Sequence, residues 1–94
     1  MSRAKYIIID AQTPYGVTFP PWVFHADIAR MLIGERDPKE VILGAGEFWV
    51  GESSVEGHEG ETVVHCYGKS VSLGIKSRGE EDALVLKASI VGLR

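Results

Sequence analysis

The side chains in this chain best suited to metal binding or acid–base chemistry are three histidines and one cysteine, His25, His58, His65 and Cys66. A zinc site needs three or four such ligands that converge, commonly as closely spaced pairs. His65 and Cys66 are neighbours in a segment of β-branched residues, so their side chains point to opposite faces of a strand. The spacing therefore predicts no metal site and no metal cofactor.

Cys66 is the one candidate thiol nucleophile. A reactive cysteine needs a neighbouring base or cation that lowers its pKa, whereas Cys66 follows the apolar pair Val63 and Val64. We interpret it as a small buried residue. Gly68-Lys69-Ser70 resembles the end of a phosphate-binding loop, but that loop has a glycine at the position of Val63 and a helix after the serine. We predict no catalytic residues and no cofactor, and a binding role over an enzymatic one.

Polar and aromatic side chains outside the expected core are the remaining candidates for ligand or partner contacts. They are His25, Trp49, Tyr67, Lys69, Ser72, Lys76 and Arg78. Basic groups interleaved with aromatic rings bind single-stranded nucleic acid, so this is one alternative function, with Lys87 as a further cation. A small enzyme or small-ligand binder with a pocket near His25 is the other. We expect His25 itself at the edge of a helix–sheet contact, bonded to a backbone carbonyl.

The charge is divided unevenly along the chain. The total of −3 consists of +1 over residues 1–36, −6 over residues 37–61 and +2 over residues 62–94. Affinity for duplex nucleic acid depends on neutralising phosphates, so nucleic acid is an unlikely partner for an acidic chain. We interpret the acidic middle as a solvated loop and sheet edge.

Length and composition predict the domain count and the compartment. A chain of 94 residues supports a single domain, residues 1–94. No apolar run approaches the roughly 20 residues that a membrane span needs, so we expect no membrane association. One cysteine excludes an intramolecular disulfide and fits a reducing compartment, which favours a cytoplasmic location.

Two segments near the C-terminus have the clearest alternating patterns. Apolar and polar residues alternate over 70–76 and again over 84–90, which predicts two strands with a shared core face. Between them, Ser77 and Glu80 have the spacing of a capping box, which predicts a short helical turn. We expect these two strands to be the centre of the fold.

The rest of the chain predicts one helix and several more strands. Apolar residues recur at helical spacing from Pro21 to Ile33, and Gly34 is a natural stop. Strands are predicted over 4–9, where the continuous run Ile7-Ile8-Ile9 favours a central position, and over 41–52 and 61–67, with a bulge, bend or break at Gly44-Ala45-Gly46. Residues 10–21 are predicted to be a loop that contains a short extended piece at 17–19. The predicted fold class is α+β, with a mainly antiparallel sheet of five or six short strands covered by one helix at about 21–33.

Three strings taken together resemble a family. FPPWVFHADIARM at 19–31, GAGEFWV at 44–50 and GKSVSLGIKSRGEEDA at 68–83 resemble small uncharacterised bacterial proteins found in phage and prophage genomes. The chain departs from that pattern at Gly79, where proline is expected. The resemblance implies a phage or prophage accessory protein and no particular activity. Because the residues predict no converging catalytic or metal set, and the chain is acidic with more aromatic surface than a small core needs, we predict a non-enzymatic interaction module that binds a protein partner or itself as a homodimer.

Overall fold

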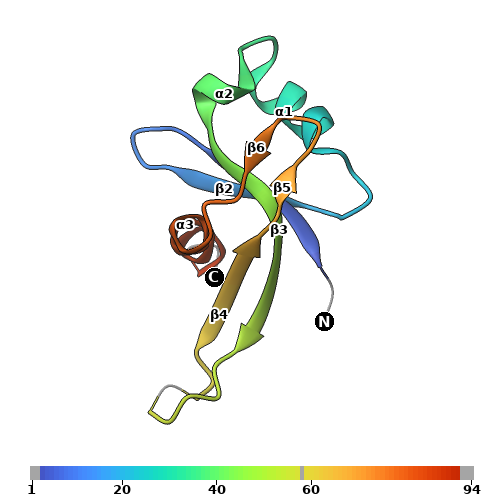
Figure 1. Ribbon diagram of the computed structural model, residues 1–94. Helices are drawn as coiled ribbons and strands as arrows, with labels where there is room; N and C mark the ends of the chain where they lie inside the picture. Colours follow the sequence, from blue (N-terminus) through green and yellow to red (C-terminus); the bar gives the residue numbers. More distant parts are fainter. Residues whose placement is uncertain (1–2, 58, 92–94) are drawn as a thin grey trace.

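The computed structural model describes residues 3–57 and 59–91, and its fold class is the predicted one. It is an α+β fold built on an antiparallel sheet of four strands in the order β2-β1-β3-β4 (Figure 1). The strands are β1 (Ala4–Ile9), β2 (Tyr15–Phe19), β3 (Ile42–Glu52) and β4 (Thr62–Tyr67), with a separate small pair β5 (Lys69–Ser70) and β6 (Ile75–Lys76). The helices are α1 (His25–Ile33), α2 (Pro38–Val41) and α3 (Glu80–Val91).

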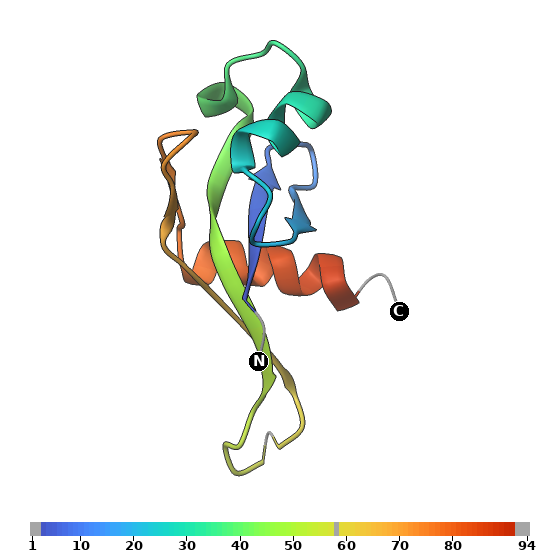
Figure 2. The same cartoon turned by 90° about the vertical axis from the view of Figure 1, so that its right-hand side faces the viewer.

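The central strand β1 is buried on both faces, as its apolar run predicted. Ile7 and Ile9 pack with Ala29 and Ile33 of α1 on one face, whereas Tyr6 and Ile8 pack with Leu86 of α3 on the other. Since side chains alternate along a strand, each helix covers its own face of the sheet. Figure 2 shows α3 crossing the sheet below α1. The molecule therefore has three layers, and the second covering helix was not predicted.

Helix α1 begins four residues later than predicted. Pro20, Pro21 and Trp22 form a turn in which the Val23 N–H donates to the Pro20 carbonyl at 3.1 Å. This turn leaves Trp22 79 % exposed, although the helical pattern had placed it on the apolar stripe. The helix ends as predicted, at Gly34 with a φ of 63°, a value that favours glycine.

The predicted strand over 84–90 is wrong, because these residues belong to helix α3. A strand would place Leu84 and Leu86 on the same face, but in the helix their exposure to solvent differs completely. Leu86 is fully buried whereas Leu84 is 71 % exposed. Asp82, Leu86 and Ser89 instead share the face toward the sheet, at spacings of four and three residues that are typical of a helix.

The predicted strand over 70–76 is also wrong, because a turn at 71–74 separates β5 from β6. The Ser70 hydroxyl accepts from the Leu73 N–H at 3.2 Å, and the Gly74 N–H donates to the Ser70 carbonyl at 2.9 Å. Serine hydroxyls compete with sheet ladders for backbone donors in this way. Val71, assigned to the core by the alternating pattern, is 84 % exposed at the tip of this turn.

The glycines of β3 do not break the strand. The bulge lies beside them, at Leu43, because Ile8 pairs with Gly44 and Ile9 with Ile42. A Cβ atom on Gly44 would overlap the Asp82 carboxylate, and one on Gly46 would overlap the Tyr67 carbonyl oxygen. The two glycines therefore let α3 and the chain after β4 approach the strand closely.

One part of the sheet projects from the body. The pairing of β1 with β3 ends at Phe48, so from Trp49 to Glu52 the only partner of β3 within the described chain is β4. We call residues 49–57 and 59–65 the β3–β4 arm; it extends downward in Figure 1, and the molecule measures 46 × 28 × 21 Å. None of the helices described is long and apolar enough to span a membrane.

Candidate functional site

The predicted site residues are spread over three places. His25, Lys69 and Ser72 line a cleft of about 370 Å³ together with Lys5 and Glu47. Trp49 and Tyr67 lie on the face of the β3–β4 pair that points away from α3. Lys76 is paired with Lys69 across the β5–β6 hairpin, and Arg78 is held by Asp82 at the start of α3. The site residues predicted from the sequence therefore do not form one basic face. Lys87 lies on α3, beside a hollow between α3 and β4.

His25 lies where the sequence predicted it. It is the first residue of α1, it is buried, and its Nε2 lies 2.9 Å from the Gly46 carbonyl oxygen, which can only accept a hydrogen bond. Nε2 therefore carries the proton of the neutral ring. Burial lowers the pKa of His25 below its ordinary value, against the opposing effect of the Gly46 carbonyl, and the Lys5 ammonium lowers it further.

The lowered pKa of His25 predicts that stability falls on acidification. Below pH about 6.5 the unfolded chain takes up a proton at this residue that the native state resists, so the free energy of unfolding decreases as the pH falls. Urea titrations should give a lower unfolding free energy at pH 5.5 than at pH 7.5. His25→Gln keeps a donor for Gly46 without titrating, so the difference should shrink in that variant. An unchanged pH dependence in His25→Gln would rule out this assignment.

Cys66 is the small buried residue that its context predicted, and it is poorly suited to nucleophilic attack. It lies in the cluster under α3, and burial raises the pKa of its thiol to about 11. The thiol packs on the α3 face, whereas His25 belongs to the α1 face, so the two do not form a catalytic pair. No group of three or more His, Cys, Asp or Glu side chains within residues 3–57 and 59–91 is placed to hold a metal ion. His58 lies outside the described residues.

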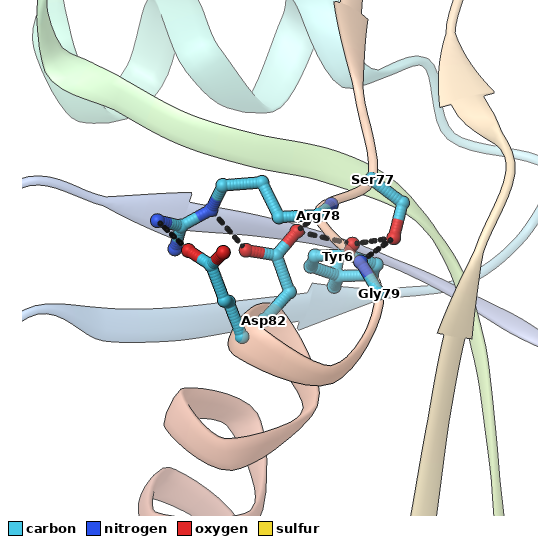
Figure 3. Close-up of polar contacts among 6 residues, drawn as sticks. Tyr6, Ser77, Arg78, Gly79 and Asp82 are labelled. Atoms are coloured by element: carbon cyan, nitrogen blue, oxygen red, sulfur yellow. Dashed lines mark hydrogen bonds and ion pairs between the residues drawn. The ribbon is translucent and has the colours of Figure 1, made fainter.

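Arg78 belongs to a buried polar cluster that holds the start of α3. The Asp82 carboxylate, fully buried, accepts from Tyr6 Oη at 2.6 Å, from the Arg78 backbone N–H at 2.9 Å and from Arg78 Nε at 2.7 Å (Figure 3). Tyrosine has one hydroxyl proton, which goes to the carboxylate, so Ser77 donates to Tyr6 Oη across 2.7 Å. Burial and the Asp82 carboxylate raise the pKa of Tyr6.

This cluster explains why the predicted capping box is only half right. Ser77 Oγ does accept from a backbone N–H, that of Gly79 at 3.0 Å, but the carboxylate that reaches back to the chain before the helix is Asp82 and not Glu80. Neither Tyr6 nor Asp82 was among the predicted site residues. The order Ser-Arg-Gly-Glu-Glu-Asp contains the signal, since any of the three acids is near enough to cap.

The face of the β3–β4 pair that points away from α3 carries a row of three neighbouring rings. Trp49 and His65 face each other across β3 and β4 with ring centroids 5.3 Å apart, and His65 stacks on Tyr67 at 5.6 Å with an interplanar angle of 25°. We call these three residues the aromatic row. His65, considered only as a metal ligand from the sequence, is its central member, because period-two spacing places 65 and 67 on one face.

The outer edge of β4 is open. β4 is the last strand of the sheet, and no described strand pairs with its far side. The Ser53 N–H donates to the Glu61 carbonyl at 2.8 Å, and continuing the register in steps of two makes Val63 and His65 members of hydrogen-bonded pairs with β3. The backbone N–H and C=O groups of Thr62 and Val64 consequently point away from β3, toward the open edge.

A hollow of about 440 Å³ lies beside this edge, where α3 crosses β4. Its lining is mostly apolar and includes Val55, Thr62, Val64, Ala83 and Leu84, with Lys87 at its margin. Leu84 and Val55 are 71 % and 63 % exposed. An open strand edge with apolar side chains next to it is a typical docking surface for another polypeptide.

Comparison with protein-family models, curated proteins and solved structures finds no match to this chain. The resemblance to phage and prophage proteins therefore stays a prediction. The class of protein must be argued from the fold and the surface described above.

Proposed function

We propose that this protein is a protein-interaction module that binds an additional polypeptide strand along the open edge of β4. The observation that supports this most directly is the outward direction of the Thr62 and Val64 backbone groups, which lack a strand partner within the described chain. A strand edge of this kind recognises extended polypeptide through main-chain hydrogen bonds, and pockets for alternate side chains give selectivity.

The construction of the arm supports the same function. A two-stranded ribbon is only marginally stable in water, and the β3–β4 arm extends beyond β1 without a third strand. It also exposes Val50, Val55 and Val63, in addition to the partly exposed aromatic row. A strand added beside β4 would give the ribbon its third strand and would remove apolar surface from water. The added strand pairing and the burial of apolar surface would both contribute favourable free energy.

The two faces beside the edge define what side chains a bound strand would carry. On one face, residues next to β4 would contact His65 and Tyr67 of the aromatic row. On the other face, they would enter the hollow lined by Val64, Ala83 and Leu84. Both favour apolar or aromatic side chains at alternate positions of the bound strand.

The first experiment selects binders from a displayed library of random peptides and measures their affinity for Val64→Pro and Val64→Thr. Proline removes the outward N–H of residue 64 without affecting the bonds to β3, whereas threonine keeps the N–H and the β-branched shape. We expect binding about tenfold weaker for Val64→Pro and little changed for Val64→Thr. A failure to retain any peptide, or equal binding by both variants, would contradict the proposal; urea titration confirms that both variants fold.

A second candidate function is binding of single-stranded nucleic acid across the aromatic row, which is favoured by its contiguous stacking. Bases stack on such rings without sequence preference, and Lys69 follows Tyr67 closely in the chain. The acidic turn at 52–61, with Glu52, Glu56, Glu59 and Glu61, opposes it. Salt-dependent binding of an oligonucleotide that is lost in Tyr67→Ala would favour this candidate over the strand-binding one.

The wider role also belongs to the proposal. An accessory protein of a phage or prophage commonly acts by contacting other proteins, which suits a small module with an open edge. A cytoplasmic location suits the single cysteine, Cys66, because a lone buried thiol forms no intramolecular disulfide that an oxidising compartment would maintain.

A further inference from the structure

We infer that the strand accepted by β4 is β4 of a second copy of this chain, paired antiparallel about a two-fold axis. This inference rests on the proposed function and names its partner. Isologous pairing of edge strands joins two four-stranded sheets into one sheet of eight, and leaves neither β4 edge exposed.

The directions of the backbone groups restrict the register of this pairing. Outward groups belong to the even-numbered residues Thr62 and Val64, so an even-numbered residue of one copy must lie opposite an even-numbered residue of the other. Two central registers satisfy this condition: Val64 opposite Val64 of the second copy, or His65 opposite His65. If Val64 lay opposite His65, the outward backbone groups of Val64 would face a residue whose own N–H and C=O point back toward β3 of the second copy. No ladder of hydrogen bonds could then form.

The distribution of charge favours an antiparallel pair of identical strands. β4 begins after the acidic turn, with Glu59 and Glu61 just before it. It ends at Tyr67, two residues before the exposed Lys69, whose cross-strand partner is Lys76. In the antiparallel arrangement the acidic end of each copy lies beside the lysines of the other. A parallel arrangement would instead bring the two acidic turns together, at an electrostatic cost.

The side chains on both faces are compatible with this arrangement. His65 stands at the centre of the aromatic row, so pairing near His65 makes the two rows continuous across the axis. On the other face, the second copy's β4 would lie next to the hollow beside Leu84, an apolar side chain of α3 that is largely exposed. Burying such surface adds to the ladder hydrogen bonds.

The test combines sedimentation equilibrium with site-specific cross-linking. In a Cys66→Ala background, single cysteines are placed at Val64, at His65 and, as a control, at Ser54 in the exposed turn, and each is treated with a short bismaleimide. Cysteine at 64 or 65 should join two chains rapidly, because it lies near the two-fold axis. Cysteine at 54 should not, because the two turns lie at opposite ends of the paired strands.

Charge-reversal variants test the expected attraction between the acidic end of one copy and the lysines of the other. Lys69→Glu should weaken the dimer about fivefold or more, and combining it with Glu59→Lys should restore most of the affinity. Val64→Pro should weaken the dimer about tenfold, whereas Val64→Thr should not.

The outcomes separate this inference from the proposed function. A chain that stays monomeric at about 100 μM, roughly the weak end of specific association, yet binds displayed peptides in a Val64→Pro-sensitive manner would overturn the homodimer and leave the strand-binding module standing. A monomer that binds no peptide would overturn both. A dimer insensitive to Val64→Pro, or cross-linked equally well at Ser54, would overturn the β4 pairing.

Discussion

Replacing Asp82 by alanine is expected to lower the free energy of unfolding by about 3 kcal/mol. The change removes the acceptor of three hydrogen bonds, those from Tyr6 Oη, the Arg78 N–H and Arg78 Nε. Tyr6 is fully buried, so its hydroxyl loses its acceptor away from water, whereas Arg78 is partly exposed and can turn to solvent. The N-terminal cap of α3 is lost at the same time.

Graded variants separate these contributions in urea titrations. Tyr6→Phe removes two hydrogen bonds, the one donated to Asp82 and the one accepted from Ser77, and leaves the Arg78 contacts, so a loss of about 1–2 kcal/mol is expected. Glu81→Ala is the matched control on the same turn of helix, because its ion pair with Arg78 is largely exposed and should contribute less than about 0.5 kcal/mol. If Asp82→Ala proved as mild as Glu81→Ala, the cluster would not be what anchors α3.

Gly44→Ala is expected to destabilise the fold by about 3 kcal/mol as well, at the upper end of the range for overpacked sites. The added methyl group would overlap the Asp82 carboxylate, which is fixed by its hydrogen bonds and cannot move aside without losing them. The cost thus arises from the cluster itself, and not from any need of β3 for a flexible residue. Alanine would otherwise suit a buried strand better than glycine.

A double-mutant cycle tests this explanation. Once Asp82 is alanine, the space beside Gly44 is open, and adding Gly44→Ala should cost less than about 1 kcal/mol further. Gly34→Ala is a useful contrast, because nothing lies near its Cβ position and its cost comes from the positive φ of 63°; that cost should not depend on Asp82. Strict additivity of Gly44→Ala and Asp82→Ala would show that the two residues do not compete for the same space.

Both predictions concern the interaction surface as well as stability. The cluster fixes where α3 starts, and α3 supplies Ala83 and Leu84 to the hollow beside β4. A loosened α3 would alter that hollow but leave the backbone edge of Thr62 and Val64 in place. Asp82→Ala is therefore expected to weaken strand binding less than Val64→Pro does, which a direct comparison of the two variants can measure.

Much of the sheet could be predicted from local patterns. The continuous run Ile7-Ile8-Ile9 indicated a buried central strand, and β1 is central; the segments 41–52 and 61–67 contain the paired strands β3 and β4. The position of His25 against a backbone carbonyl was predicted too, and so was the stop at Gly34. These features depend on one residue type or one periodicity within a short window, which is what a single sequence reports well.

The failures at 70–76 and 84–90 have a common physical cause. In a short segment of Leu, Val, Ala and Ser, alternation is compatible with a strand, but it is also compatible with a helix or with a turn closed by a serine hydroxyl. Leu84 and Leu86 look equivalent in the pattern, yet one is exposed and the other fully buried. What distinguishes them is contact with Gly16 and Tyr6, residues that lie more than 60 positions earlier.

By itself, the sequence determined the fold class, the strands β1, β3 and β4 and the end of α1, because each follows from local polarity and backbone preference. Only the tertiary structure decided that Asp82 is buried against Tyr6, that α3 covers the second face, that His65 joins Trp49 and Tyr67, and that β4 has an open edge. These features depend on contacts between segments that are distant in the sequence. Which segments pack together is decided by the apolar surface that the complete fold buries, and no short window of sequence reports that.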